Sequence, residues 1–101
     1  MAQLKRTVVN QGGAGTLVIA AASPGNKHKL LGFILSLSSD GTFQFTDGTG
    51  ILMGAMKIKQ DANSVVALSL SPIVETAVNS PLNLVTTSGG GRGVAIFVTE
   101  P

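Results

Sequence analysis

Short runs of apolar and β-branched residues recur along this chain, and each is closed after a few positions by glycine, asparagine, aspartate, serine or proline. This punctuation is typical of strands joined by turns, and no stretch predicts a helix. About eight short strands with turns every 8–12 residues are typical of an antiparallel sandwich or jelly roll. We therefore predict an all-β fold, a single small antiparallel β-sandwich or jelly roll of about eight strands, with residues 1–101 in one domain.

The strand boundaries follow from the same runs. Strands are expected at residues 4–9, 16–22, 28–38, 42–46, 51–53, 56–59, 65–70, 82–87 and 93–99. The longest run alternates so that one face is wholly apolar and is predicted to lie in the core: Leu31, Phe33, Leu35 and Leu37. In the run 56–59, Met56 and Ile58 are expected to point inward, and the link through Glu75 is expected to be irregular.

The filling of the core is limited by the composition. The chain is 44% hydrophobic and 12% charged, with four phenylalanines and no tryptophan or tyrosine, so all four phenylalanines are expected in the core. A surface with so little charge and apolar residues to spare indicates further burial against other copies or a partner. The alternative is that the strands expose some apolar surface, as most proteins do.

Charge and hydropathy exclude several functions. The net charge is +2, and the cations come as separated pairs without tryptophan or tyrosine between them, which argues against nucleic-acid binding. The first six residues lack the apolar core of a signal peptide, and no apolar run approaches the roughly 20 residues of a membrane helix. We expect a protein made in the cytoplasm, with no membrane partner.

No arrangement of residues predicts catalysis, a cofactor or a metal site. The single histidine, His28, lies between two lysines and is expected to be solvated, and without cysteine a metal site is improbable. Asp40, Asp47 and Asp61 lie in turns, where aspartate caps its own backbone. The glycine runs at 12–15 and 89–91 lack the residues of a phosphate loop and are expected to be turns. We therefore expect no catalytic residue, cofactor, metal or small-molecule substrate, and no enzyme activity.

Five segments share a pattern, at residues 29–38, 42–49, 52–56, 75–77 and 82–84. Together they resemble a group of small virion-associated β proteins of tailed bacteriophages. The resemblance covers about 70 residues, and it departs from the pattern at Ile73 and Val74, where bulky aromatic residues are expected. It is carried by residues 29–38, Thr42-Phe43-Gln44-Phe45-Thr46-Asp47-Gly48-Thr49, Leu52-Met53-Gly54-Ala55-Met56, Glu75-Thr76-Ala77 and Leu82-Asn83-Leu84.

This resemblance implies a non-enzymatic viral structural protein that decorates and stabilises a bacteriophage capsid. The partners it implies are the major capsid protein and copies of itself, with a homotrimer as the expected oligomer, and the location is the capsid exterior of the virion. A symmetric lattice site favours a cyclic oligomer. The alternatives are a phage tail, fibre or baseplate component, or a small carbohydrate-binding β-sandwich, although four core phenylalanines leave no aromatic platform for a sugar.

The N-terminal segment is the candidate for docking or oligomer contact. Residues 1–15 form either an extended arm with a glycine hinge, which adds to the sheet edge of a neighbour, or the first strand of the chain's own sandwich. The candidate contact residues are Leu4, Lys5, Arg6, Val8 and Val9.

Overall fold

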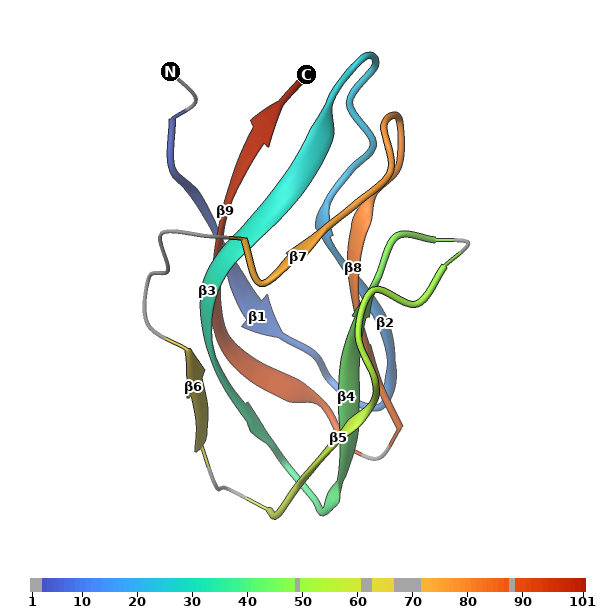
Figure 1. Ribbon diagram of the computed structural model, residues 1–101. Helices are drawn as coiled ribbons and strands as arrows, with labels where there is room; N and C mark the ends of the chain where they lie inside the picture. The colour runs from blue at the N-terminus through green and yellow to red at the C-terminus, as the bar shows by residue number, and fades with distance from the viewer. Residues whose placement is uncertain (1–2, 49, 61–62, 67–71, 88) are drawn as a thin grey trace.

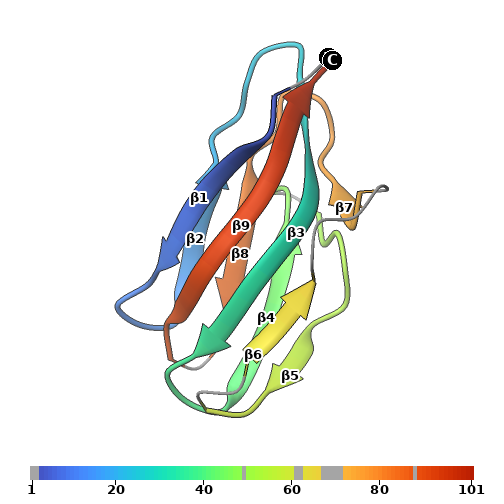
Figure 2. The same cartoon turned by 90° about the vertical axis from the view of Figure 1, so that its left-hand side faces the viewer.

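The protein is a two-layered antiparallel β-sandwich (Figures 1 and 2). The structure, a computed structural model, describes residues 3–48, 50–60, 63–66, 72–87 and 89–101. In this part of the chain there is no helix, and the strands are β1 (Lys5–Asn10), β2 (Gly15–Ala20), β3 (Lys27–Leu37), β4 (Gly41–Thr46), β5 (Met56–Ile58), β6 (Asn63–Val66), β7 (Val74–Glu75), β8 (Leu82–Thr86) and β9 (Gly91–Glu100).

The order of the strands is that of a jelly roll. Sheet A has the order β1-β9-β3-β6, with the short β7 also paired to β3, and sheet B has the order β2-β8-β4-β5. Early strands pair with late ones as nested couples, β1 with β9, β2 with β8, β3 with β6 and β4 with β5, and these couples alternate between the sheets. Such nested pairs arise when one long hairpin of strands wraps around a barrel, which is the topology of a jelly roll. The predicted all-β sandwich is confirmed.

Most of the expected strands are present, with their ends displaced by a residue or two. Of the run 65–70, Val65 and Val66 lie in β6, whereas residues 67–70 and the turn at Asp61 lie outside the described residues. The run 51–53 is not a strand, because only Ile51 forms a bridge, with Thr46.

The core between the sheets is built around three phenylalanine rings. Phe33 from sheet A contacts Phe43 and Phe45 from sheet B, with ring centroids 5.8 and 5.3 Å apart, and these two rings are 6.3 Å from each other. All four phenylalanines are buried, as predicted. Aliphatic side chains from both sheets fill the remaining space: Val9, Ile19, Leu30, Leu35, Val74, Leu82, Leu84 and Ala95.

A bulge divides β3 and changes which residues face the core. The pairing of β3 with β9 shifts register between Leu30 and Gly32, so Leu31 is inserted and only half-buried. Leu30 points inward before the bulge, and the inward face resumes with Phe33 after it. The prediction that Leu31 shares the core face was therefore wrong, because strict alternation does not survive an extra residue.

One smaller expectation also fails, and a second holds only in part. Val74 and Glu75, expected in an irregular link, form β7 against β3, and Val74 is buried. Met56 lies opposite the inward-facing Phe43, on the side expected, but it is 45% exposed because β5 is the edge strand of sheet B, whereas Ile58 packs against the core.

Candidate interaction surface

The outer face of sheet A carries an apolar row between two arginines. The pairing register places Val8 of β1 opposite Val94 of β9, and Val94 opposite Ile34 of β3. Paired residues of an antiparallel sheet point to the same side, and the inward residues of these strands are the buried ones, so this row faces away from the core. Ile96 lies on the same face, one row further toward the end of β9. Figure 2 shows β1, β9 and β3 side by side in front of sheet B.

These side chains are exposed to an unusual degree for such apolar residues. Val8 is 71% exposed and Ile34 47%, and Val94 and Ile96 are half-buried. All four are β-branched, so they have few rotamers to lose when a partner covers them. We name this face the sheet A patch, made of Arg6, Val8, Ile34, Arg92, Val94 and Ile96.

The arginines of the sheet A patch carry unneutralised charge. Arg6 lies beside Ile96, and Arg92 lies between Asn10 and Ser36, so the two flank the Val8 row on opposite sides. Both are exposed, and within the described residues neither forms an ion pair. The apolar row is thus bordered by positive charge.

The structure divides the residues predicted for docking. Lys5–Asn10 is β1, paired along its length with β9 of the same chain, so this segment is the first strand of the sandwich. Arg6 and Val8 lie together on the outer face, but Val9 is buried in the core and is not available for contact. Lys5 lies on the opposite side of β1 from Arg6, and Leu4 precedes the strand and is exposed.

Sequence reasoning missed the residues that complete the patch. Alternation along 28–38 places Ile34 on the non-core face, yet nothing local links it to β1. Val94, Ile96 and Arg92 join Arg6 and Val8 only because β9 lies between β1 and β3. Alternating apolar and small residues in the run 93–99 were the available signal, but they do not say which side faces the core.

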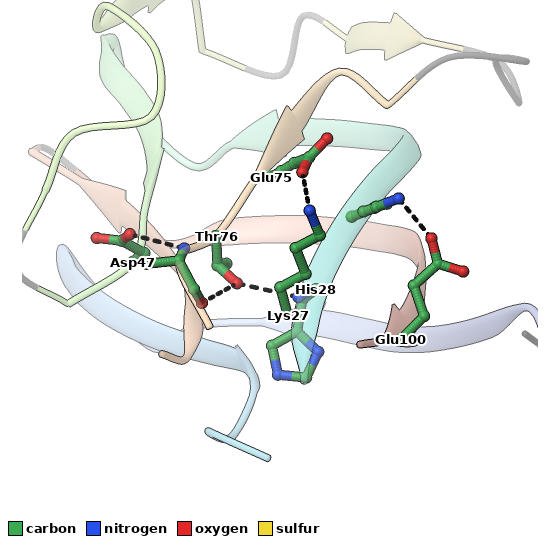
Figure 3. A network of polar contacts seen from close by, with 8 residues as sticks. Lys27, His28, Asp47, Glu75, Thr76 and Glu100 are labelled. Atoms are coloured by element: carbon green, nitrogen blue, oxygen red, sulfur yellow. Dashed lines mark hydrogen bonds and ion pairs between the residues drawn. The ribbon is translucent and has the colours of Figure 1, made fainter. Parts of the chain in front are cut away.

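At one end of the molecule, a polar network fixes three segments to each other (Figure 3). The backbone of His28 donates to the Thr76 hydroxyl and accepts from the Thr76 N–H, both at 2.9 Å. The buried carboxylate of Asp47 accepts from the N–H of Gly50 at 2.8 Å and from the N–H of Ala77 at 3.2 Å. Asp47 therefore caps its own turn, as expected, and also holds the segment after β7.

The imidazole of His28 is buried, which corrects the expectation of a solvated histidine. The side chain is 2% exposed, because it shares the inward face of β3 with Leu30. Its Nε2 lies 2.8 Å from the Ala21 carbonyl, which can only accept, so Nε2 carries a hydrogen, and its Nδ1 shares a hydrogen bond with the Thr99 hydroxyl at 2.8 Å. The ring also meets Phe97 edge-on. Both ring nitrogens are used in holding the fold together.

Two ion pairs neutralise the cations at the same end of sheet A. Lys27 binds Glu75 of β7 at 2.8 Å, and Lys29 binds Glu100 near the end of β9. The hydrogen bond from Lys27 lowers the pKa of Glu75, and the hydrogen bond to Glu100 raises the pKa of Lys29. Charge at this end is therefore largely balanced, in contrast to the sheet A patch.

Low pH is expected to weaken the contact between β7 and β3, because protonation of Glu75 removes its ion pair with Lys27. Because the pKa of the folded carboxyl is lowered, its stabilising effect is complete above the pKa of an unfolded glutamate, about 4.3, and is lost as the pH falls through the folded value. Glu75→Gln should therefore melt below the wild type at about pH 7, and this difference should shrink as the pH falls below about 4.3. Thermal melts of both proteins across this range measure the gap. A difference in melting temperature that does not change with pH would contradict this stabilising role of the Glu75 carboxylate.

Asn83 contains a buried atom with no partner. Its side chain is 7% exposed on the outer face of sheet B, and its Oδ1 accepts no hydrogen bond. It borders a hollow of about 290 Å³ together with Thr46, Ile51 and Val85. The oxygen is closed off from solvent, so a molecule in this hollow would not reach it.

Replacing Asn83 with leucine is expected to stabilise the protein. Leucine has a similar shape and removes the desolvated acceptor, so the free energy of unfolding should rise by about 1 kcal/mol, or about 4–8 °C in Tm. Urea titration measures the difference, and Asn10→Leu, at an exposed position of β1, is the control with little expected change. A lower free energy of unfolding for Asn83→Leu would show that the side-chain amide of Asn83 stabilises the folded protein.

The described residues contain no cluster of three or more histidine or acidic side chains that could hold a metal ion. A second hollow, of about 520 Å³, lies beside the β4–β5 pair and is lined by Asp40, Thr42, Lys57, Ile58 and Lys59, among others. In its lining, the Thr42 hydroxyl is hydrogen-bonded to the Thr87 hydroxyl at 2.8 Å, and the Asp40 carboxylate accepts from the Gln60 N–H at 2.7 Å. In the part of the chain that is described, no helix is long and apolar enough to cross a membrane.

Comparison with known proteins identifies no family for this chain. No protein-family model matches this chain, and no curated protein matches it. Among solved structures, it is similar to two crystal structures of the capsular polysaccharide assembling protein CapF from Staphylococcus aureus. The first is 15% identical with a TM-score of 0.40 and covers 99% of this chain and 23% of that chain. The second is 12% identical with a TM-score of 0.29 and covers 98% and 30%. This chain spans less than a third of either, and so distant a likeness carries no functional inference.

Proposed function

We propose that this chain is a non-enzymatic structural protein of a bacteriophage particle that decorates and stabilises the capsid as an oligomer. The observation that carries the proposal is the sheet A patch. Exposed β-branched side chains on a rigid three-strand surface are suited to a fixed protein contact, whereas they offer no group for chemistry. A decoration protein needs such a surface, because it gains stability from many repeated contacts with a lattice.

The phage resemblance supports the same function, and several of its segments meet in space. Glu75-Thr76-Ala77 contacts the Asp47 turn through Ala77 and the start of β3 through Thr76. Glu75 in turn pairs with Lys27. In the register of sheet A, Glu75 also lies opposite Lys29, the first residue of the segment 29–38. Parts of three of the segments therefore lie together at one end of the jelly roll.

Self-association is supported by the outer face of sheet B. On β2, β8 and β4 the outward residues are uncharged, and they include Thr16, the exposed Val18, Gln44 and Val85. Lys57 lies on the edge strand β5 of the same face, so the uncharged area is that of the other three strands. Copies that pack on these three strands bury no charged side chain. Burying one would cost roughly several kcal/mol per ion. We propose the trimer as the oligomer, since three-fold lattice sites match it.

The test is the presence and position of the chain on virus particles. Particles of the virus that encodes it, purified by density gradient, are expected to contain the protein in many copies, with gold-labelled antibody on the head in electron micrographs. Light scattering of the purified protein is expected to give the mass of three chains. Absence of the chain from purified particles would refute a virion role, and label on the tail would favour the tail, fibre or baseplate alternative.

A further inference from the structure

The charge of the sheet A patch identifies the kind of surface that it contacts. Resting on the proposed function, we infer that the outer face of sheet A docks on a surface of a different protein in which carboxylates flank an apolar centre. In the decorated particle, that protein is the capsid subunit. The inference names the docking face and the chemistry of its partner, which the proposed function leaves open.

The geometry sets where the carboxylates must lie. Arg6 stands two residues before Val8 on β1, and Arg92 stands two residues before Val94 on β9. The strands are antiparallel, so the two arginines lie on opposite sides of the Val8 row, on neighbouring strands. Four residues of strand separate their rows, or roughly 13 Å along the sheet. A matching partner carries two acidic groups about that far apart, with apolar side chains between them.

The guanidinium group is suited to such a partner. Arginine binds a carboxylate through two parallel hydrogen bonds, and it is less strongly hydrated than lysine, so it is favoured at protein interfaces. Arg6 and Arg92 have no carboxylate partner among the described residues, whereas Lys27 and Lys29 on the same sheet do. The unpaired cations of this face are thus the two that border its exposed apolar row.

A second copy of the chain does not fit this face. Two copies stacked through sheet A would bring four guanidinium groups into one interface. The carboxylates on this side of the described structure, Glu75 and Glu100, are held by lysines. Burying unpaired charges is strongly unfavourable. An anionic membrane also fits poorly, because among the described residues the patch carries no aromatic or leucine side chain to enter the lipid.

The experiment compares two charge reversals of equal size. Purified wild-type protein, Arg6→Glu with Arg92→Glu, and Lys57→Glu with Lys59→Glu are titrated onto particles from a virus whose copy of the gene is deleted, and bound protein is measured after sedimentation. Lys57 and Lys59 are exposed residues on and just after β5, outside the patch, so the control changes net charge equally. Lys57 lies at the edge of the outer face of sheet B, and Lys59 lies 3.8 Å from the exposed Asp40, so light scattering verifies that the control keeps the oligomer of the wild type. All substituted side chains are exposed, and circular dichroism verifies folding.

The arginine reversal should weaken binding roughly 100-fold or more, and the lysine reversal should leave it within a few-fold of wild type. Arg6→Gln and Ile34→Ser, each made alone, should also weaken binding and cover the case in which the double variant fails to fold. Wild-type binding should fall as salt is raised.

The outcomes separate this inference from the proposed function. If the wild type binds and both double variants bind equally well, the inference is overturned and the decoration role stands. If the wild type does not bind the particles, both fall. If the arginine reversal instead dissociates the oligomer in light scattering, the face contacts a second copy and the inference is overturned. The protein is also sedimented with vesicles that contain phosphatidylserine. Binding to these vesicles that is lost in the arginine reversal would overturn the inference, because the partner would then be a membrane.

Discussion

Replacing Gly93 with alanine is expected to leave the chain unable to fold. Gly93 lies in β9, between β1 and β3, with a φ of +146°. A Cβ built there would lie 1.8 Å from the Ile34 carbonyl oxygen and 2.8 Å from its carbon. These atoms belong to the backbone of the neighbouring strand, so the clash is relieved only by separating β9 from β3. The loss should be well above about 4 kcal/mol, which is comparable to the whole stability of a domain at the low end of the usual range of about 5–15 kcal/mol.

The matched control is Gly12→Ala. Gly12 lies between β1 and β2, a Cβ there meets no atom within 4 Å, and no left-handed backbone angle is required. This variant should fold with nearly the wild-type melting temperature. Circular dichroism and gel filtration of the soluble fraction compare the two proteins. A folded Gly93→Ala protein that melts within a few degrees of wild type would show that β9 can move away from β3 at little cost.

Truncating Phe33 to alanine is the second change with a large expected effect. The ring is 3% exposed and contacts both Phe43 and Phe45 across the sandwich, so it joins the two sheets. Its removal leaves a cavity at the centre of the core, and the expected loss is about 3–5 kcal/mol. Because a domain of this size is stable by about 5–15 kcal/mol, the variant should be folded only marginally.

The neighbouring residue supplies the control for this prediction. Ile34→Ala alters the next position of β3, whose side chain points away from the core, and should cost no more than about 1 kcal/mol. Urea denaturation gives both values. Similar losses for the two variants would mean that the phenylalanine cluster is not the centre of the core.

A jelly roll by itself does not specify a function, since the same architecture serves viral capsid proteins, lectins and enzymes. The functional proposal therefore depends on the sheet A patch and not on the fold. In this chain all four phenylalanines lie inside, which removes the aromatic platform that a carbohydrate site usually presents. The side chains left outside on sheet A favour contact with another protein.

The sequence alone determined the all-β class, most of the strands and the burial of the phenylalanines. These properties follow from local rules: glycine, proline and aspartate end strands wherever they cluster, and alternation in a strand reports its two faces. Where a local rule was broken by one residue, prediction failed. The bulge at Leu31 returned His28 and Leu30 to the core. The one local signal was Gly32, because an isolated glycine inside a strand often marks a bulge, but it does not say which residue is inserted.

Only the tertiary structure decided which strands are neighbours and therefore where the candidate site lies. Arg6 and Val8 are separated from Val94 by more than 80 positions, yet β1 and β9 pair because the jelly roll joins the first strand to the last. Ile34 completes the patch from a third strand. Pairing over such distances depends on how both sheets close around one core, which is a property of the whole chain, whereas strands and turns are properties of a few consecutive residues.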